Sequence, residues 1–205
     1  MANLSDAFGD VIIEKVGKEF LEFIYKVQGD DAYYTLVDKY DVKDNVPDKD
    51  GDLKFSFGTS GRWAYSNNVE GYLNGTWMGN NEKEKKAYAK FISALKKKNG
   101  SVTIEYTDSD TAMDWMGTGV ATLSVIDGEV SFHDDFESET ITISGYAKLN
   151  GDDEHWALEY IYGEEVGEEY DKYVEKWKQE HEYKKGDSEP AGPDEWFTND
   201  YKPEE

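Results

Sequence analysis

The sequence contains no cysteine, and that absence excludes several kinds of chemistry. A chain without thiols forms no disulfide framework, no thiolate zinc site and no cysteine nucleophile. Long apolar runs are also missing, since no stretch approaches the ~18 residues of a membrane-spanning helix. Residues 1–10 lack the charged and apolar regions of a secretory signal peptide. We therefore predict a cytoplasmic protein.

Basic residues are scarce as well. The 205 residues include 45 Asp and Glu but only 22 Lys and Arg, among which Arg62 is the single arginine, and the formal net charge is −23. Small domains typically carry a net charge of about 2–8 in magnitude. Such an excess of negative charge disfavours contact with phosphate backbones and with anionic lipids. We expect neither nucleic acid nor a membrane among the direct partners.

Aromatic side chains, in contrast, are plentiful. They make up 15% of the chain, with 15 Tyr, 9 Phe and 6 Trp, although the apolar residues together reach only 38%. Disordered acidic chains have few such rings, so this composition indicates a folded protein with an aromatic core. The length suits one domain with additions, or two small domains.

Hydrophobic periodicity and turn signals predict an α+β fold. The clearest element is a hairpin over 120–136, because Asp127-Gly128 between β-rich runs favours a type I′ turn. The other expected strands are 4–14, 53–58, 62–66, 101–107 and 139–149, and the expected helices are 17–28, 30–40, 81–98 and 164–183. This order predicts a largely antiparallel sheet with two helices on one face, as a ferredoxin-like βαββαβ core plus the hairpin, followed by an acidic C-terminal helix.

Composition also predicts three parts along the chain. Residues 1–150 form the expected α+β core domain, and 151–183 form an acidic helical extension. Glycine and proline recur from residue 184 onward and interrupt regular structure, so 184–205 are expected to be a mobile acidic tail.

A few residues resemble a known fold family. Gly61-Arg62-Trp63 follows a predicted turn, and Asp114-Trp115 precedes the Gly119–Phe136 hairpin. In these features, which span about 80 residues, the chain resembles the YubB-like ferredoxin-fold proteins of plasmids and phages. The resemblance implies a topology and includes no catalytic motif.

The negative charge is unevenly distributed. Residues 1–80 have a net charge of −6, 81–98 a net charge of +5, 99–149 a net charge of −9 and 150–205 a net charge of −13. Within the acidic half, one row of acids falls at i, i+4, i+7 and i+11, which places it on one face of a helix. Other acids form i, i+2 pairs on one side of a strand, about 6.6 Å apart. Like charges at these spacings oppose folding, which indicates a surface kept for a partner.

In size, acidity, aromatic content and lack of cysteine, the chain resembles the acidic DNA-mimic inhibitors of phages and plasmids, of the anti-restriction and anti-CRISPR type. That resemblance implies a protein without enzymatic activity that binds the basic nucleic-acid-binding groove of a defence nuclease through carboxylates in place of phosphates. The expected partner-binding residues are Glu164, Glu168, Asp171, Glu175, Asp127, Glu129, Glu137 and Glu139, together with Trp63 and Trp77. An acidic surface that only maintains solubility is the alternative.

Other functions have weaker support in the sequence. Trp63 and Trp77 lie near Gly-rich segments, so an accessory protein that binds a protein or small ligand through aromatic loops is the second hypothesis. Gly58–Gly61 lacks the lysine of a phosphate-binding loop, and Gly117-x-Gly119 lacks a third glycine, so both are interpreted as turns. The Asp48–Asp52 segment does not match a calcium loop. No cofactor or metal is expected, and a hydrolase with scattered carboxylates is a third hypothesis.

Overall fold

The computed structural model describes residues 4–28, 35–62, 64–78, 81–110, 115–181 and 190–202. The chain divides into two compact units, residues 1–139 and residues 140–205. The expected boundary at residue 150 therefore differs from the observed one. None of the helices in the described residues combines the length and the apolar character needed to cross a membrane.

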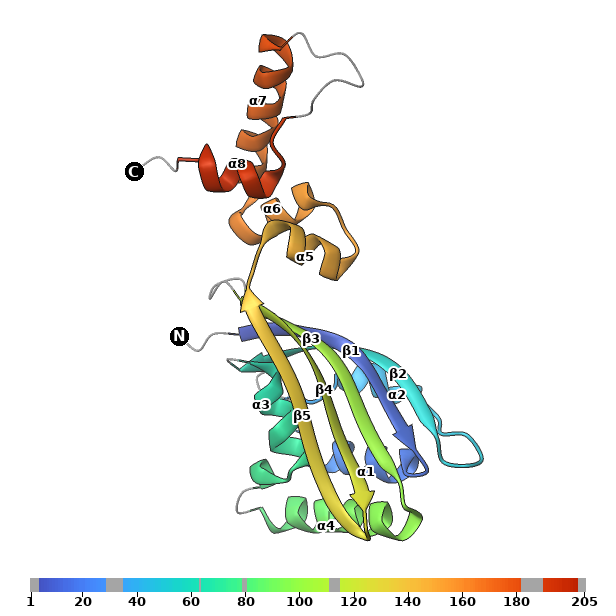
Figure 1. Ribbon diagram of the computed structural model, residues 1–205. Helices are drawn as coiled ribbons and strands as arrows, with labels where there is room; N and C mark the ends of the chain where they lie inside the picture. The colour runs from blue at the N-terminus through green and yellow to red at the C-terminus, as the bar shows by residue number, and fades with distance from the viewer. Residues whose placement is uncertain are drawn as a thin grey trace. The chain divides into compact units, whose positions relative to one another are not determined.

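The first unit is an antiparallel sheet with helices, and it confirms the α+β class (Figure 1). Its strands are β1 (Leu4–Glu14), β2 (Leu53–Arg62), β3 (Ser101–Asp110), β4 (Trp115–Ile126) and β5 (Glu129–Thr140). Its helices are α1 (Gly17–Val27), α2 (Lys39–Lys43), α3 (Tyr65–Leu73), the 3-10 turn η1 (Thr76–Met78) and α4 (Glu82–Lys98). The strand order across the sheet is β2-β1-β3-β4-β5.

The strand order does not confirm the ferredoxin-like arrangement. In a split βαβ unit another strand lies between the two strands that a helix connects. Here β1 and β2, which are connected through α1 and α2, are direct antiparallel neighbours, with Val11 opposite Phe55. On its other side β1 pairs with β3, where Val11 lies opposite Ile104.

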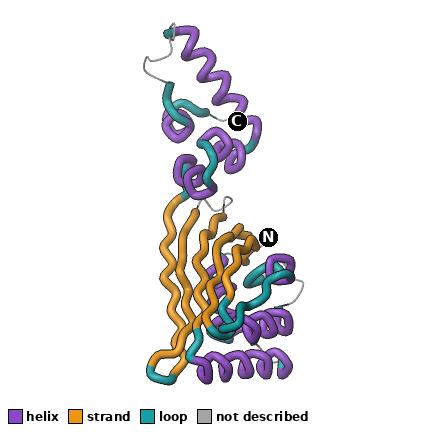
Figure 2. Tube along the Cα trace, turned by 90° about the vertical axis from the view of Figure 1, so that its right-hand side faces the viewer, coloured by secondary structure: helices purple, strands orange, loops and turns teal. Residues whose placement is uncertain are grey.

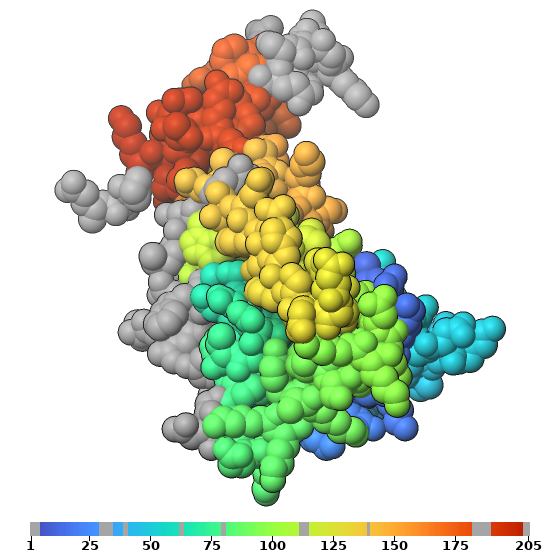
Figure 3. Space-filling model, turned by 60° about the horizontal axis from the view of Figure 1, so that its bottom comes forward, coloured from blue at the N-terminus to red at the C-terminus, as the bar shows by residue number. Residues whose placement is uncertain are grey.

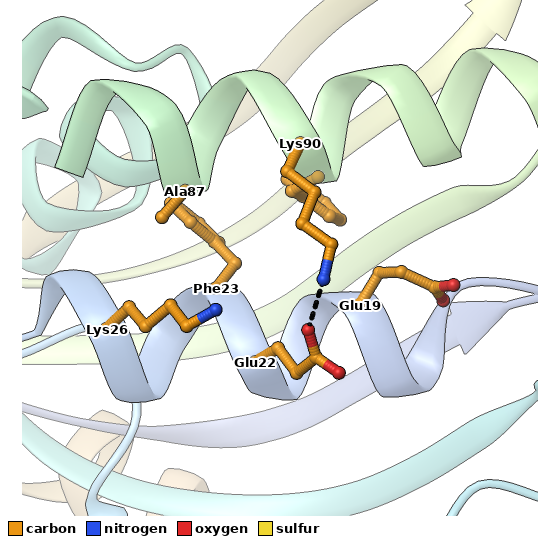
Figure 4. A pocket seen from close by; sticks show the side chains of 7 residues that line it. Glu19, Glu22, Phe23, Lys26, Ala87 and Lys90 are labelled. Atoms are coloured by element: carbon orange, nitrogen blue, oxygen red, sulfur yellow. Dashed lines mark hydrogen bonds and ion pairs between the residues drawn. The ribbon is translucent and has the colours of Figure 1, made fainter. Parts of the chain in front are cut away.

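The helices α1, α3 and α4 lie on one side of the sheet (Figure 2). Apolar residues recur at helical spacing in α1 and α4, so each helix has one face for the core. The rings of Phe23 and Phe91 stack there with centroids 5.1 Å apart, and both side chains are buried. At the edge of this contact the Lys90 Nζ lies 2.6 Å from the Glu22 carboxylate (Figure 4).

The predicted hairpin is confirmed. Strands β4 and β5 are joined by Asp127 and Gly128, whose φ angles are +52° and +80°. Positive φ at both central residues is the requirement of a type I′ turn, which Asp-Gly meets with little strain.

Two glycine-containing segments that were expected to be turns are strands. Gly58–Gly61 lies within β2, and Gly117 and Gly119 lie within β4. A Cβ atom on Gly119 would lie only 2.3 Å from the ring of Tyr106. Glycine is required in this part of β4 because the aromatic rings of neighbouring strands lie against its backbone.

The second unit consists of helices α5 (Ile143–Asn150), α6 (Glu154–Tyr162), α7 (Glu164–Glu180) and α8 (Pro193–Asn199). The strand expected over 139–149 is wrong, because Thr142 caps a helix there through its hydroxyl, which accepts from the N–H of Gly145. The structure also differs from the mobile tail expected over 184–205, since residues 193–199 form the helix α8, in which Trp196 is only 4% exposed. The Asp194 carboxylate accepts from the N–H groups of Ile143 and Ser144, which fixes α8 to the start of α5.

Candidate functional site

The face of the sheet opposite the helices is the candidate site of the first unit. Successive side chains of a strand alternate between the two faces, so buried Val11 and Ile13 point to the helices while their neighbours point away. Among the described residues of this unit, no helix covers the face of the sheet that points away from α1, α3 and α4 (Figure 2). We call it the open sheet face, and its side chains include Asp6, Phe8, Asp10, Lys54, Ser56, Glu105, Thr107, Thr118, Val120, Asp135 and Glu137.

The middle of the open sheet face is a broad concavity of about 610 Å³. Phe8 and Val120 line it and are 37% and 44% exposed. Asp10 and Glu105 line the same concavity. An apolar centre surrounded by charged groups is the arrangement found in protein interfaces.

Two of these acids face each other across the sheet. Asp10 of β1 lies directly opposite Glu105 of β3, and like charges in such a pair destabilise a sheet. The Lys54 Nζ lies 2.9 Å from the Asp10 carboxylate, and the Ser56 hydroxyl donates to that carboxylate at 2.6 Å. The Ser56 hydrogen bond and then Lys54 lower the pKa of Asp10, while Asp10 and Glu105 raise the pKa of Lys54.

Positive and negative charges of this unit are segregated. Among the strand side chains that the structure describes, Lys54 is the only lysine or arginine on the open sheet face. The helix α4, in contrast, has seven exposed lysines, which are Lys83, Lys85, Lys86, Lys90, Lys96, Lys97 and Lys98. Figure 3 shows α4 in green on the surface beside the yellow β5. The open sheet face is therefore acidic, whereas the helix α4 of the same unit is basic.

The predicted acids of the hairpin have different surroundings. Asp127 is exposed in the turn, and Glu137 is exposed on β5. Glu129 forms an ion pair with α4, because the Lys96 Nζ lies 2.5 Å from its carboxylate and lowers its pKa. The backbone of Glu139 belongs to β5, but its side chain is outside the described atoms.

The predicted row on α7 is a set of exposed side chains in the second unit. Val166, Tyr170 and Tyr173 lie on the packed side of the helix. Three acids of the row each precede one of these positions by two residues, which is about half a turn of the helix, and the fourth follows the third by one turn, so the row lies on the other side. The acids are Glu164, Glu168, Asp171 and Glu175. The Asp171 carboxylate lies 3.2 Å from the Nε2 of His155 in α6. The row and the open sheet face belong to different units.

Of the two predicted tryptophans, only Trp77 belongs to the described residues. Trp63 lies outside the described residues. Trp77 packs against Tyr72 with ring centroids 5.6 Å apart, and a Cβ on Gly71 would lie 2.2 Å from its indole. The indole therefore helps to hold η1 on α3.

We expect Trp77→Ala to lower the free energy of unfolding by about 2 kcal/mol, because a partly buried indole leaves a space that the backbone fills only in part. Urea denaturation monitored by circular dichroism measures this change. If binding to a partner is lost while the unfolding midpoint is unchanged, the indole is an interface residue and the packing role is wrong. Trp177→Ala, which removes an indole from the second unit, is the control for the effect of losing a tryptophan on the circular dichroism signal.

A pair of buried aspartates lies at the end of β3. Asp108 is fully buried and Asp110 is 1% exposed. One Asp108 oxygen accepts from the N–H of Tyr65 at 2.5 Å, and the other has no hydrogen-bond partner within the described residues. Burial raises the pKa of Asp108 to about 6, although Ser5 and the Tyr65 N–H act in the opposite direction. Alternation along β3 places Asp108 on the same side as buried Ile104 and Tyr106.

Nearby, Tyr106 links β3 to β5. Its hydroxyl donates to Asp134 at 3.1 Å, and its ring stacks on Phe136 with centroids 5.9 Å apart. Burial, and then the Asp134 charge, raise the pKa of Tyr106. Burial also raises the pKa of Asp134. These contacts place Asp134 on the helical side, so its neighbours Asp135 and Glu137 point to the open sheet face.

The described residues contain no candidate metal site. Their His, Asp and Glu side chains include no group of three suited to a metal ion. The space between α1 and α4, lined by Glu22 and Lys90 among others, is about 10 Å³ and has room for a single water molecule (Figure 4).

Comparison of the sequence with protein-family models and with curated proteins, and of the fold with solved structures, gave no match. Sequence reasoning had missed Asp6, Asp10 and Glu105 as members of one surface. Their alternation with buried residues in β1 and β3 was the signal that would have grouped them.

Proposed function

We propose that this protein binds the basic nucleic-acid-binding groove of a nuclease and that its carboxylates take the positions of phosphates. The observation that carries the proposal is the segregation of charge in the first unit, where the acids gather on the open sheet face and the lysines on α4. A surface that served only solubility would gain nothing from this segregation, because mixed charges maintain solubility equally well.

The spacing of the acids supports phosphate mimicry. Neighbouring strands are about 4.8 Å apart, and alternate residues of one strand about 6.6 Å apart. Asp135 and Glu137 are such alternate residues, and Asp10 and Glu105 are cross-strand neighbours. These intervals are comparable to the separation of successive phosphates along a nucleic-acid strand. The partner's Lys and Arg side chains would form charge-assisted hydrogen bonds with the carboxylates.

The partner class follows from the resemblance to acidic phage and plasmid inhibitors, which makes a defence nuclease of the CRISPR or restriction type the first candidate. In this proposal the α7 row, Glu164, Glu168, Asp171 and Glu175, adds a second acidic surface. The protein is an inhibitor without catalytic activity of its own, and it acts in the cytoplasm.

A pull-down from a bacterial lysate that contains defence nucleases tests the proposal. We expect a basic nuclease to be retained at 50 mM salt, to bind at least about tenfold more weakly at 200 mM salt, and to be displaced by double-stranded DNA. Mass spectrometry identifies the retained protein. Retention that resists salt and is insensitive to DNA would contradict phosphate mimicry.

A further inference from the structure

The second unit has a cavity of its own at the junction of α6 and α7. Its volume is about 570 Å³, and it is lined by Tyr162, Gly163, Glu164, Glu165, Val166, Glu169 and Tyr201. Two aromatic rings and three carboxylates thus line the same space, and its described lining contains no lysine or arginine. We call it the Tyr–Glu pocket.

Stacking contacts hold the two tyrosines of the Tyr–Glu pocket in place. Phe197 of α8 stacks on Tyr162 with ring centroids 4.0 Å apart, and on Tyr201 with centroids 5.1 Å apart. Tyr201 also contacts buried Trp196, and its N–H donates to the Trp196 carbonyl at 3.0 Å. The pocket is therefore built on a fixed aromatic stack, and Tyr162 still leaves 36% of its surface exposed.

Local structure explains only two of the three glutamates of the pocket. Glu164 and Glu165 occupy the first turn of α7, where negative side chains favour the helix. Glu169 lies beyond the first turn and has no such role. Within the described residues, none of the three has a hydrogen bond or an ion pair with another side chain. A space lined by three carboxylates and two tyrosines fits a positively charged ligand.

We infer that the Tyr–Glu pocket binds a guanidinium group, and that this group is the side chain of an arginine in a protein partner. The described carboxylates form no group of three suited to a metal ion, so an organic cation fits them better. A guanidinium is planar and stacks on aromatic rings, and its N–H groups pair with carboxylates in a fork, whereas an ammonium is a point charge that keeps its water. The inference holds whether or not the open sheet face mimics phosphates.

Free arginine and an arginine side chain share the same guanidinium, but the pocket distinguishes them. The backbone end of free arginine has an α-ammonium and an α-carboxylate, which would both have to lose water near the pocket, and the carboxylate would also be repelled by Glu164, Glu165 and Glu169. A peptide-bound arginine has no such carboxylate near its side chain. We therefore expect N-acetyl-argininamide to bind the protein at least about threefold more tightly than free arginine does.

NMR titration of the full-length protein tests the inference, with the aromatic signals of Tyr162 and Tyr201 as the readout. N-acetyl-argininamide should shift both signals in a saturable way with a dissociation constant of about 1 mM, and N-acetyl-lysinamide should bind more weakly. The amide of N-acetyl-citrulline has the same shape without the charge and should not bind. Equal shifts by the citrulline amide, tighter binding of free arginine or of the lysine amide, or no saturation by about 20 mM would each overturn the inference.

Two sets of variants identify the pocket as the binding site. Glu165→Gln with Glu169→Gln leaves the aromatic stack intact and should weaken binding of N-acetyl-argininamide about tenfold. Glu168→Gln with Glu175→Gln makes the same change of charge on the same helix, but outside the pocket. This pair should weaken binding of N-acetyl-argininamide by less than about twofold. Tyr201→Leu should also weaken binding at least about fivefold, provided that the circular dichroism spectrum is unchanged. Equal effects of the two glutamine pairs would overturn the assignment.

Discussion

Neutralising four carboxylates of the open sheet face is expected to weaken binding to the nuclease by about a thousandfold while the protein stays folded. The variant combines Asp6→Asn, Asp10→Asn, Glu105→Gln and Glu137→Gln. If each lost charge pair contributes about 1 kcal/mol, the four together change the dissociation constant by about three orders of magnitude. Binding to the nuclease recovered from lysate, measured by calorimetry at 50 mM salt, gives the value directly. The dependence of binding on salt should also become flatter.

The same variant should not be less stable than the parent. Its substitutions remove the like-charged pair of Asp10 and Glu105, which opposes pairing of β1 with β3. They also remove the ion pair of Asp10 with Lys54, which is well exposed and contributes little. An equal or slightly higher unfolding midpoint together with weaker binding separates a binding surface from a structural one.

A matched control has the same change of charge at acids outside the open sheet face. It combines Asp44→Asn, Asp50→Asn, Glu82→Gln and Glu84→Gln, all in loops or in the first turn of α4. Binding of this control should fall by less than about tenfold. If both variants lose affinity equally, binding follows the total charge and the open sheet face is not the site.

Much of the fold was predictable because local signals agreed with the final structure. The hairpin of β4 and β5 was predictable from Asp127-Gly128, since few dipeptides accept two positive φ angles. The helices over Gly17–Val27 and Glu82–Lys98 were predictable because each has one apolar face.

The errors have a common physical cause, which is contact between residues distant in sequence. The glycines of β4 had the signature of a turn, but they lie in a strand because Tyr106 and Phe136 pack against them. Likewise α8 lay in a segment with the composition of a tail, and it is ordered by Trp196 and by the Asp194 contacts with α5. Neither contact is visible in a short stretch of sequence.

The candidate site was predictable only in kind. The excess of acids indicated a surface for a basic partner, and the helical spacing placed the α7 row on one exposed side. The open sheet face joins acids from β1, β3 and β5, so its composition depends on the strand order. The ferredoxin-like order expected from the sequence would have grouped different residues.

The largest expected effect on stability comes from Asp108. In the unfolded chain its pKa is near 3.8, whereas burial raises the pKa to about 6 in the folded protein. Between these values the folded state retains a proton that the unfolded state has lost. The stability that Asp108 contributes is thus fully present below about pH 4 and is lost as the pH rises through 6. A shift of about two pKa units corresponds to about 3 kcal/mol.

Asp108→Asn should therefore make stability less dependent on pH. The amide oxygen still accepts from the Tyr65 N–H, and the amide nitrogen, which replaces the unpartnered oxygen, costs about 1 kcal/mol if it finds no acceptor. We expect the variant to be about 1 kcal/mol less stable than the parent at pH 4 and about 2 kcal/mol more stable at pH 8. Urea denaturation at both pH values measures the difference, provided that the slope with urea is unchanged.

The sign of this change distinguishes a buried carboxyl group from an ordinary one. The control Asp50→Asn alters an exposed loop residue and should change stability by less than about 0.5 kcal/mol at either pH. If Asp108→Asn lowers stability equally at pH 4 and pH 8, the carboxyl has the same pKa in both states. The folded protein would then stabilise the ionised Asp108 carboxylate as well as water does in the unfolded chain. This would require a further group beside the oxygen that has no partner. A gain that develops as the pH rises from about 4 to about 6 instead shows that the folded chain retains an uncompensated carboxylate at the end of β3, at the expense of its own stability.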